Sequence, residues 1–148
     1  MRIRARAVAV RDGKILLVQH NGSSTNFWAL PGGGVDEYES TKETLIREMK
    51  EELLVDVKLG KLLFIQELLS KEKDWHSMEF FYEILKPEKL DISRWKESEF
   101  AHELSAVGWK DIDDENLVVL PKVVLDELRK HKGELPESWN TKHVINNI

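Results

Sequence analysis

The sequence contains no cysteine among its 148 residues, and this absence excludes several kinds of site. Disulfide bridges, zinc sites built on thiolates and cysteine nucleophiles all require the missing side chain. Any catalytic or metal-binding chemistry in this chain must therefore use oxygen and nitrogen groups.

The sequence also lacks long apolar runs and an excess of basic residues. No stretch approaches the ~20 apolar residues of a membrane-spanning helix, and Arg4 and Arg6 interrupt the region where a signal peptide has its apolar core. We therefore expect a cytoplasmic protein with no membrane partner. Lys+Arg 22 against Asp+Glu 27 gives a formal net charge of -5, whereas duplex-binding surfaces usually carry a basic excess. Duplex nucleic acid is not expected as a partner.

The composition that remains is typical of one folded domain. Hydrophobic residues make up 41% of the chain and charged residues 33%, which is a globular rather than a disordered balance. A chain of this length can bury one sizeable core. We predict a single domain over residues 1–148.

The first twenty residues predict two strands. Residues 2–10 place Ile3 and three alanines on one side and three arginines on the other, which predicts a strand whose arginine face is solvated. Asp12-Gly13 is a strong signal for a two-residue hairpin, and a buried strand is expected at 15–20. Pro31 and the glycines at 32–34 predict a segment without regular structure.

The rest of the chain predicts a mixed order of strands and helices that does not repeat as strand-helix-strand units. Strands are expected at 55–69 with a break at Gly60, at 78–85 and at 103–112, with a final helix at about 117–131 and an irregular tail at 132–148.

A helix is predicted from Ser40 to about Leu54. Ser40 is a candidate N-cap, and Glu43 is placed to complete a capping box with it. One stripe of this helix is apolar and is expected to face the core; it comprises Leu45, Ile46, Met49 and Leu53. Three carboxylates lie on a neighbouring face, those of Glu48, Glu51 and Glu52.

Like charges at this spacing repel one another on a helix, so a compensating positive group is expected. A hard divalent cation such as Mg²⁺ prefers oxygen ligands and often shares its coordination with substrate phosphates. Glycines before the helix let the backbone approach a ligand closely, and Arg47 can order the carboxylates by a bidentate pair. The pattern predicts a site for a diphosphate carried by metal ions; the alternative is a solvated helix face.

This stretch resembles the Nudix box, and the resemblance is carried by residue types at fixed spacing. The matching positions are Gly33, Glu39, Arg47, Glu48, Met49, Glu51, Glu52 and Val55. Leu54 is the one departure, because the family has glycine there. The approach "WALPGGGVDE", the first hairpin, the late strand and the closing helix are also similar to the family's small-domain layout.

The resemblance implies an α/β/α sandwich around a mixed β-sheet and hydrolysis of a nucleoside diphosphate linked to another group. It implies Mg²⁺ or Mn²⁺ bound by Glu48, Glu51 and Glu52, with the Gly32 carbonyl as a further candidate ligand. Glu39 and Arg47 would orient the site. In some members a glutamate of a later loop completes the metal site or acts as the base; Glu103 is the first choice here, ahead of Glu99 and Glu97.

The substrate is left open between a nucleoside triphosphate and an ADP-ribose-like sugar nucleotide. An enzyme acting on RNA 5′ ends and a non-catalytic nucleotide sensor are the alternatives. Phe27 and Trp28 could stack a nucleobase, although strand core is the preferred interpretation of Trp28, and phosphate contacts are considered less favoured for His20 and His76. Small domains of this family often dimerise, so a homodimer is left open.

Overall fold

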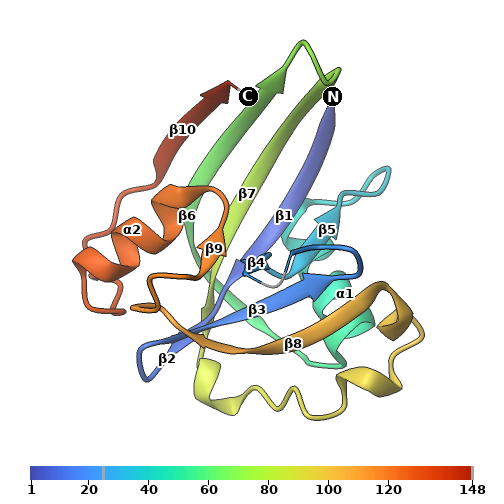
Figure 1. Cartoon of the computed structure of the whole chain (residues 1–148), viewed down its shortest axis with the longest axis vertical. Helices are drawn as coiled ribbons and strands as arrows, with labels where there is room; N and C mark the ends of the chain where they lie inside the picture. The colour runs from blue at the N-terminus through green and yellow to red at the C-terminus, as the bar shows by residue number, and fades with distance from the viewer. Residues whose placement is uncertain (25, 148) are drawn as a thin grey trace.

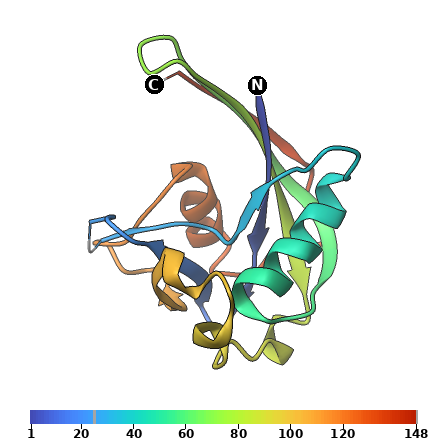
Figure 2. The same cartoon turned by 90° about the vertical axis from the view of Figure 1, so that its right-hand side faces the viewer.

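The computed structural model describes residues 1–24 and 26–147. A five-stranded sheet lies between helix α1 on one side and, on the other, a small sheet and helix α2 (Figure 1, Figure 2). The strands are β1 Arg2–Val8, β2 Val10–Arg11, β3 Lys14–His20, β4 Phe27–Trp28, β5 Gly32–Gly34, β6 Lys58–Ser70, β7 Trp75–Leu85, β8 Leu104–Asp111, β9 Val118–Val119 and β10 Lys142–Asn147. The helices are α1 Thr41–Leu53 and α2 Lys122–Lys130, with short 3-10 turns at Pro87–Lys89, Trp95–Glu97 and Ala101–Glu103.

The large sheet is mixed, with strand order β10-β6-β7-β1-β5. Strand β1 pairs parallel to β7 and antiparallel to β5, and β10 pairs parallel to β6. A second sheet has the order β2-β3-β8, and β4 pairs with β9. This mixed sheet between helices confirms the fold class expected from the sequence.

Two hydrophobic cores form because both faces of the large sheet are covered. Helix α1 packs on the face that carries the alanines of β1, with Leu45, Met49 and Leu53 fully buried. Helix α2 and strand β3 belong to the core on the other face, where Phe64 and Phe81 meet edge to face at 6.1 Å between ring centroids.

Local signals in the sequence are confirmed at the hairpin and the helix start. Asp12 and Gly13 both have positive φ, 49° and 72°, as a tight hairpin turn requires. Ser40 caps α1, and its capping box with Glu43 is complete. Ile46 was expected in the core stripe but is 46% exposed, and Thr44 is buried instead.

Two predictions of irregular structure were wrong, and a third was right in part. Gly32–Gly34 form β5, and Gly32, at φ 142°, approaches β1 so closely that a Cβ atom there would lie 2.0 Å from the Ala5 carbonyl oxygen. Gly60 lies inside β6, but the pairing of β6 with β7 shifts register between Leu59 and Leu62, so the expected break is an irregularity within a continuous strand. The tail expected to be irregular contains β10, which gains its hydrogen-bond partners from β6. Each of these segments is ordered by a strand distant in sequence, which no local pattern reveals.

Leu54 ends α1 in the left-handed conformation, with φ 57° and ψ 36°. Its N–H donates to the Lys50 carbonyl oxygen at 3.1 Å, which is the αL capping pattern usually taken by glycine. The missing family glycine therefore changes the residue but not the way the helix ends.

Candidate active site at the carboxylate helix

Arg47 is the centre of an ion-pair network on the outer face of α1. Its Nε donates to Glu39 Oε2 at 2.8 Å and its Nη2 to Glu39 Oε1 at 2.9 Å, a bidentate pair. Its Nη1 donates to Glu48 Oε1 at 2.9 Å and to Glu51 Oε2 at 3.2 Å. The Arg47 hydrogen bonds hold the pKa of Glu39 at about 2. Arg47 thus supplies a positive charge that offsets the negative charges of Glu39, Glu48 and Glu51.

Glu48 is pressed against the glycine strand. A Cβ atom at Gly33 would lie 2.5 to 2.8 Å from the Glu48 carboxylate atoms, whereas one at Gly34 would meet nothing within 4 Å. The second glycine of the run is therefore the one that makes room for this side chain. Burial raises the pKa of Glu48, although the Arg47 hydrogen bond lowers it in part.

Glu52 carries the most perturbed carboxylate of the three. Its pKa rises to about 8, because burial disfavours the charged form and the negative charge of Glu48 adds to the effect. The positive charge of Arg6 opposes this rise, and Glu103 adds a further negative charge nearby. Glu52 therefore lies in a partly buried acidic site that lacks a full counter-charge.

Of the late-loop candidates, Glu103 is the one whose charge acts on a box glutamate in the described part of the chain. Glu103 ends a 3-10 turn next to β8, and its charge acts on both Glu52 and His20. Glu97 instead pairs with Arg94 at 2.6 Å on an exposed surface. Gly32 lies opposite Arg6 in the β1–β5 pairing, next to the glycine that accommodates Glu48.

A cavity of about 390 Å³ is lined in part by Arg6 and His20, which interact electrostatically with Glu52 and Glu103 respectively. Most of its lining is apolar, Trp28 and Trp75 included, and its polar groups are Arg4, Arg6, His20, Gln66 and Glu79. Arg6 is 15% exposed, donates from Nε to Glu79 Oε2 at 3.3 Å and from Nη1 to the Leu30 carbonyl oxygen at 3.3 Å. The prediction that the arginine face of β1 is solvated was therefore wrong for Arg6.

Trp28 belongs to the core as preferred from the sequence, and one of its edges also lines the cavity. Burial and the charge of Arg6 lower the pKa of His20, so at neutral pH its imidazole is uncharged. Sequence reasoning missed Trp75, Gln66 and Glu79. They come from β6 and β7, and only the strand pairing places them beside β1.

The donor set fits a hard divalent cation in its chemistry. Within residues 1–24 and 26–147, no three acidic or histidine side chains already converge as ligands, and Glu48 and Glu51 each give an oxygen to Arg47. The half-buried Glu48 and Glu52 carboxylates nevertheless lie beside one another with raised pKa values. A divalent cation between them would offset that repulsion with oxygen ligands of the preferred type.

Comparison with known proteins places the chain in a family. The model of the NUDIX domain matches residues 1–129. The CTP pyrophosphohydrolase of Escherichia coli strain K12 is 41% identical over 56 residues, which are 36% of this chain and 42% of that protein. The RNA pyrophosphohydrolase of a Nitratiruptor species is 35% identical over 97 residues, 57% of this chain and 61% of that protein. The matches thus span about half the length of these curated relatives.

Solved structures agree with the family model. An ADP-ribose pyrophosphatase from Streptococcus suis 89-1591 superposes with a TM-score of 0.62 at 27% identity, covering 96% of this chain and 98% of that one. The E. coli ORF135 protein superposes with a TM-score of 0.67 at 22% identity, covering 93% and 95%. No helix in the described part of the chain is long and apolar enough to cross a membrane. With the box residues Arg47, Glu48, Glu51 and Glu52 on the outer face of α1 and a family model matching most of its length, the chain belongs to the Nudix family.

Proposed function

We propose that this chain is a Mg²⁺- or Mn²⁺-dependent hydrolase that cleaves the pyrophosphate bond of a nucleoside diphosphate linked to another group. The observation that carries the proposal is the half-buried Glu48–Glu52 pair, in which Glu48 is bonded to Arg47 and Glu52 interacts with Arg6 of the cavity. A fully solvated helix face would not partly bury these carboxylates or raise their pKa values.

The metal would be held by Glu48 and Glu52, with Glu51, Glu103 and the Gly32 carbonyl as further ligands, and it would polarise the phosphates and activate water. Arg47 keeps Glu48 and Glu51 oriented through hydrogen bonds of 2.9 and 3.2 Å. Arg6 lines the cavity and its positive charge acts on Glu52, so its proposed role is to bind a substrate phosphate.

Glu103 is proposed to complete the metal site or to take a proton from water. Its charge already acts on Glu52, so both groups can bind or activate the same molecule. Glu103→Gln should lower kcat, whereas Glu97→Gln, which removes only an exposed pair with Arg94, should not.

The cavity supports a nucleotide as the substrate class. Aromatic rings of Phe27, Trp28 and Trp75 line it together with two arginines, which suits a nucleobase beside phosphates. The relatives named above act, by their names, on CTP, RNA and ADP-ribose. An RNA 5′-end pyrophosphohydrolase is the second candidate, favoured by the several curated relatives of that name.

The test is a panel of nucleoside triphosphates, ADP-ribose, diadenosine polyphosphates and 5′-triphosphate RNA with Mg²⁺ or Mn²⁺, with products identified by mass. Metal-dependent release of phosphate or pyrophosphate from a member of the panel is expected. Binding of nucleotides without turnover of any of them would instead support the nucleotide-sensor alternative.

A further inference from the structure

The three arginines of β1 form one charged face of the large sheet. Arg2, Arg4 and Arg6 occupy alternate positions and lie opposite Ser77, Glu79 and Phe81 of β7. Alternate residues of a strand are roughly 6.6 to 6.8 Å apart and point to the same side. That spacing is comparable to the separation of successive phosphates along an extended nucleic-acid strand.

This face carries more positive than negative charge. By the strand pairing, Glu79 is the one carboxylate that β1, β6, β7 and β10 place on it, and Glu79 is bonded to Arg6. No ion pair joins Arg2 or Arg4 to a carboxylate in the described part of the chain. Burial and the neighbouring charge of Arg6 also lower the pKa of Arg4. An anionic ligand would relieve this repulsion.

Trp75, at the hairpin end of β7, adds an aromatic surface beside Arg2 and Arg4. The guanidinium carbons of Arg2 and Arg4 lie 4.3 and 5.6 Å from the centroid of its ring. The Nε1 of Trp75 donates to Ser77 Oγ at 3.1 Å, which fixes the ring orientation. The ring is half-buried, and nucleobases stack on aromatic rings and on guanidinium planes of this kind.

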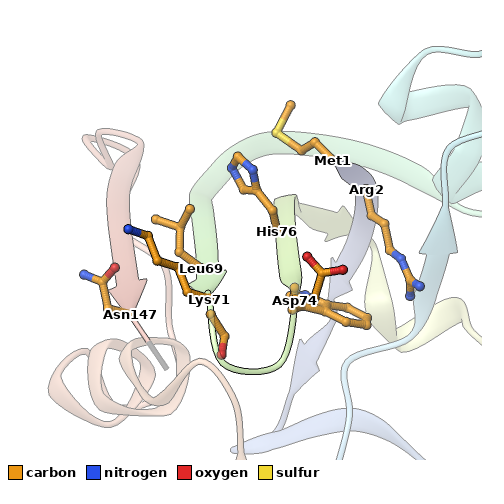
Figure 3. Close-up of a pocket in the computed structure, with 9 residues that line it drawn as sticks. Met1, Arg2, Leu69, Lys71, Asp74, His76 and Asn147 are labelled. Atoms are coloured by element: carbon orange, nitrogen blue, oxygen red, sulfur yellow. The ribbon is translucent and has the colours of Figure 1, made fainter.

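Two cavities meet at this tryptophan. The inner cavity is lined by Arg4, Arg6 and Trp75. An outer one of about 860 Å³, at the end of the sheet, is lined by Arg2, Trp75 and Lys71 and also by His76, which belongs to the opposite face (Figure 3). Asp74 at the hairpin turn also lines the outer cavity. The end of the sheet that carries the outer cavity projects beyond α1 and α2 (Figure 1, Figure 2), so this part of the face is open to a ligand.

We propose that this arginine face, Arg2, Arg4 and Trp75, is a subsite for the phosphodiester backbone and bases of a single-stranded nucleic acid whose 5′ phosphates are held at the carboxylate site. The proposal rests on the function proposed above and names its substrate class. From Arg6 to Arg2 the strand rises ~13 Å, enough for about two internucleotide steps beyond the first nucleotide. A mononucleotide would occupy the inner cavity alone.

The first experiment is a length series of 5′-triphosphorylated oligonucleotides of one to six residues, in ribose and deoxyribose forms. We expect kcat/KM to rise about tenfold between one and three nucleotides and then to level off. The ribose and deoxyribose arms decide whether the natural strand is RNA or DNA.

The second experiment uses Arg2→Ala, with Arg94→Ala as a control that removes an equal charge from an exposed surface. Arg2→Ala should lose most of the gain from the third nucleotide while leaving mononucleotide turnover unchanged. Oligonucleotide affinity should be measured by anisotropy at several salt concentrations without added metal. In a plot of the logarithm of the binding constant against the logarithm of the salt concentration, the slope for Arg2→Ala should be shallower than that of the wild type by about 0.7, which is the contribution of one phosphate contact on a single strand. The control should change neither quantity.

Equal kcat/KM for mononucleotides and oligonucleotides would overturn the proposal while the hydrolase function stands. A change in Tm for Arg2→Ala without a change in length preference would do the same, because it would leave the arginine–tryptophan stack a purely structural role. If no substrate is hydrolysed, the proposed function fails, and the salt slope alone then decides whether the subsite binds nucleic acid. Inorganic polyphosphate should compete for the subsite more weakly than an oligonucleotide, because it has no bases to stack on Trp75. If the two compete equally well, the proposed stacking of bases on Trp75 is wrong.

Discussion

The left-handed conformation of Leu54 predicts that Leu54→Gly is more stable than Leu54→Ala. Both variants remove the same partly exposed side chain, so their difference isolates the backbone. An L-residue pays about 1–2 kcal/mol for the left-handed region, whereas glycine adds roughly 0.5–1 kcal/mol of unfolded-state entropy. The net preference for glycine should be about 0.5–1 kcal/mol in the free energy of unfolding.

The assay is urea unfolding of both variants, supported by thermal melting, in which 1 kcal/mol corresponds to about 2–4 °C for a chain of roughly this size. Lys50 supplies the matched control, because it lies within α1 and its side chain is exposed. There the order should reverse, with Lys50→Gly less stable than Lys50→Ala. Both Lys50 variants lose the same ion pair with Asp56.

A Leu54→Ala variant as stable as Leu54→Gly, or more stable, would refute the reasoning. It would mean that the helix does not end through a strained residue at this position. Since the αL hydrogen bond from Leu54 to Lys50 needs only a backbone N–H, neither variant should lose catalytic activity.

Three further predictions concern the carboxylate site. Gly33→Ala should lower activity at least tenfold with little loss of stability, because its Cβ displaces the flexible end of Glu48, whereas Gly34→Ala should be close to neutral; equal activities in a metal-dependent assay would contradict this. Glu39→Gln should be less stable than the wild type by about 1–2 kcal/mol at neutral pH, after solvent screening is allowed for. Because the folded pKa of Glu39 is depressed to about 2, this stabilisation is present above the unfolded pKa near 4.5 and is lost as the pH falls towards 2; a difference in urea midpoints that stays constant from pH 7 to pH 3 would count against it. Glu52→Gln should be neutral or stabilising in EDTA, because folding raises the pKa of Glu52 beside Glu48 to about 8 and the variant removes the cost of that rise, whereas Glu51→Gln should gain nothing since it gives up a bond to Arg47; a clear fall in the Tm of Glu52→Gln would disprove the first part.

The elements that depend on neighbouring residues were predictable from sequence. The Asp12-Gly13 turn and the Ser40 capping box are local signals, and both are present. The buried residues of α1 followed from periodicity except at the edge of the stripe, where Ile46 is exposed. The spacing of the box predicted that Glu48, Glu51 and Glu52 lie on one face of a helix, and all three lie in the single helix α1.

What could not be predicted depends on pairing between distant strands. β5 and β10 are short or polar and become strands only because β1 and β6 offer free edges. Alternation correctly put the arginines of β1 on one face, but it could not reveal that Glu79 of β7 and Trp75 lie beside them. Glu103 was selected from several loop glutamates by analogy, and only the folded chain brings its charge to Glu52.

The most direct test of the proposed function is the Mg²⁺-dependent turnover of Glu52→Gln on whichever nucleotide the wild type hydrolyses fastest. Glu52 is half-buried and interacts with Glu48 and Arg6, so exchanging one oxygen for an amide removes the proposed metal ligand without changing the shape of the site. Turnover should be abolished while the melting curve without metal stays like that of the wild type. Near-normal turnover in this variant would contradict the assignment of the helix carboxylates as a metal-binding active site.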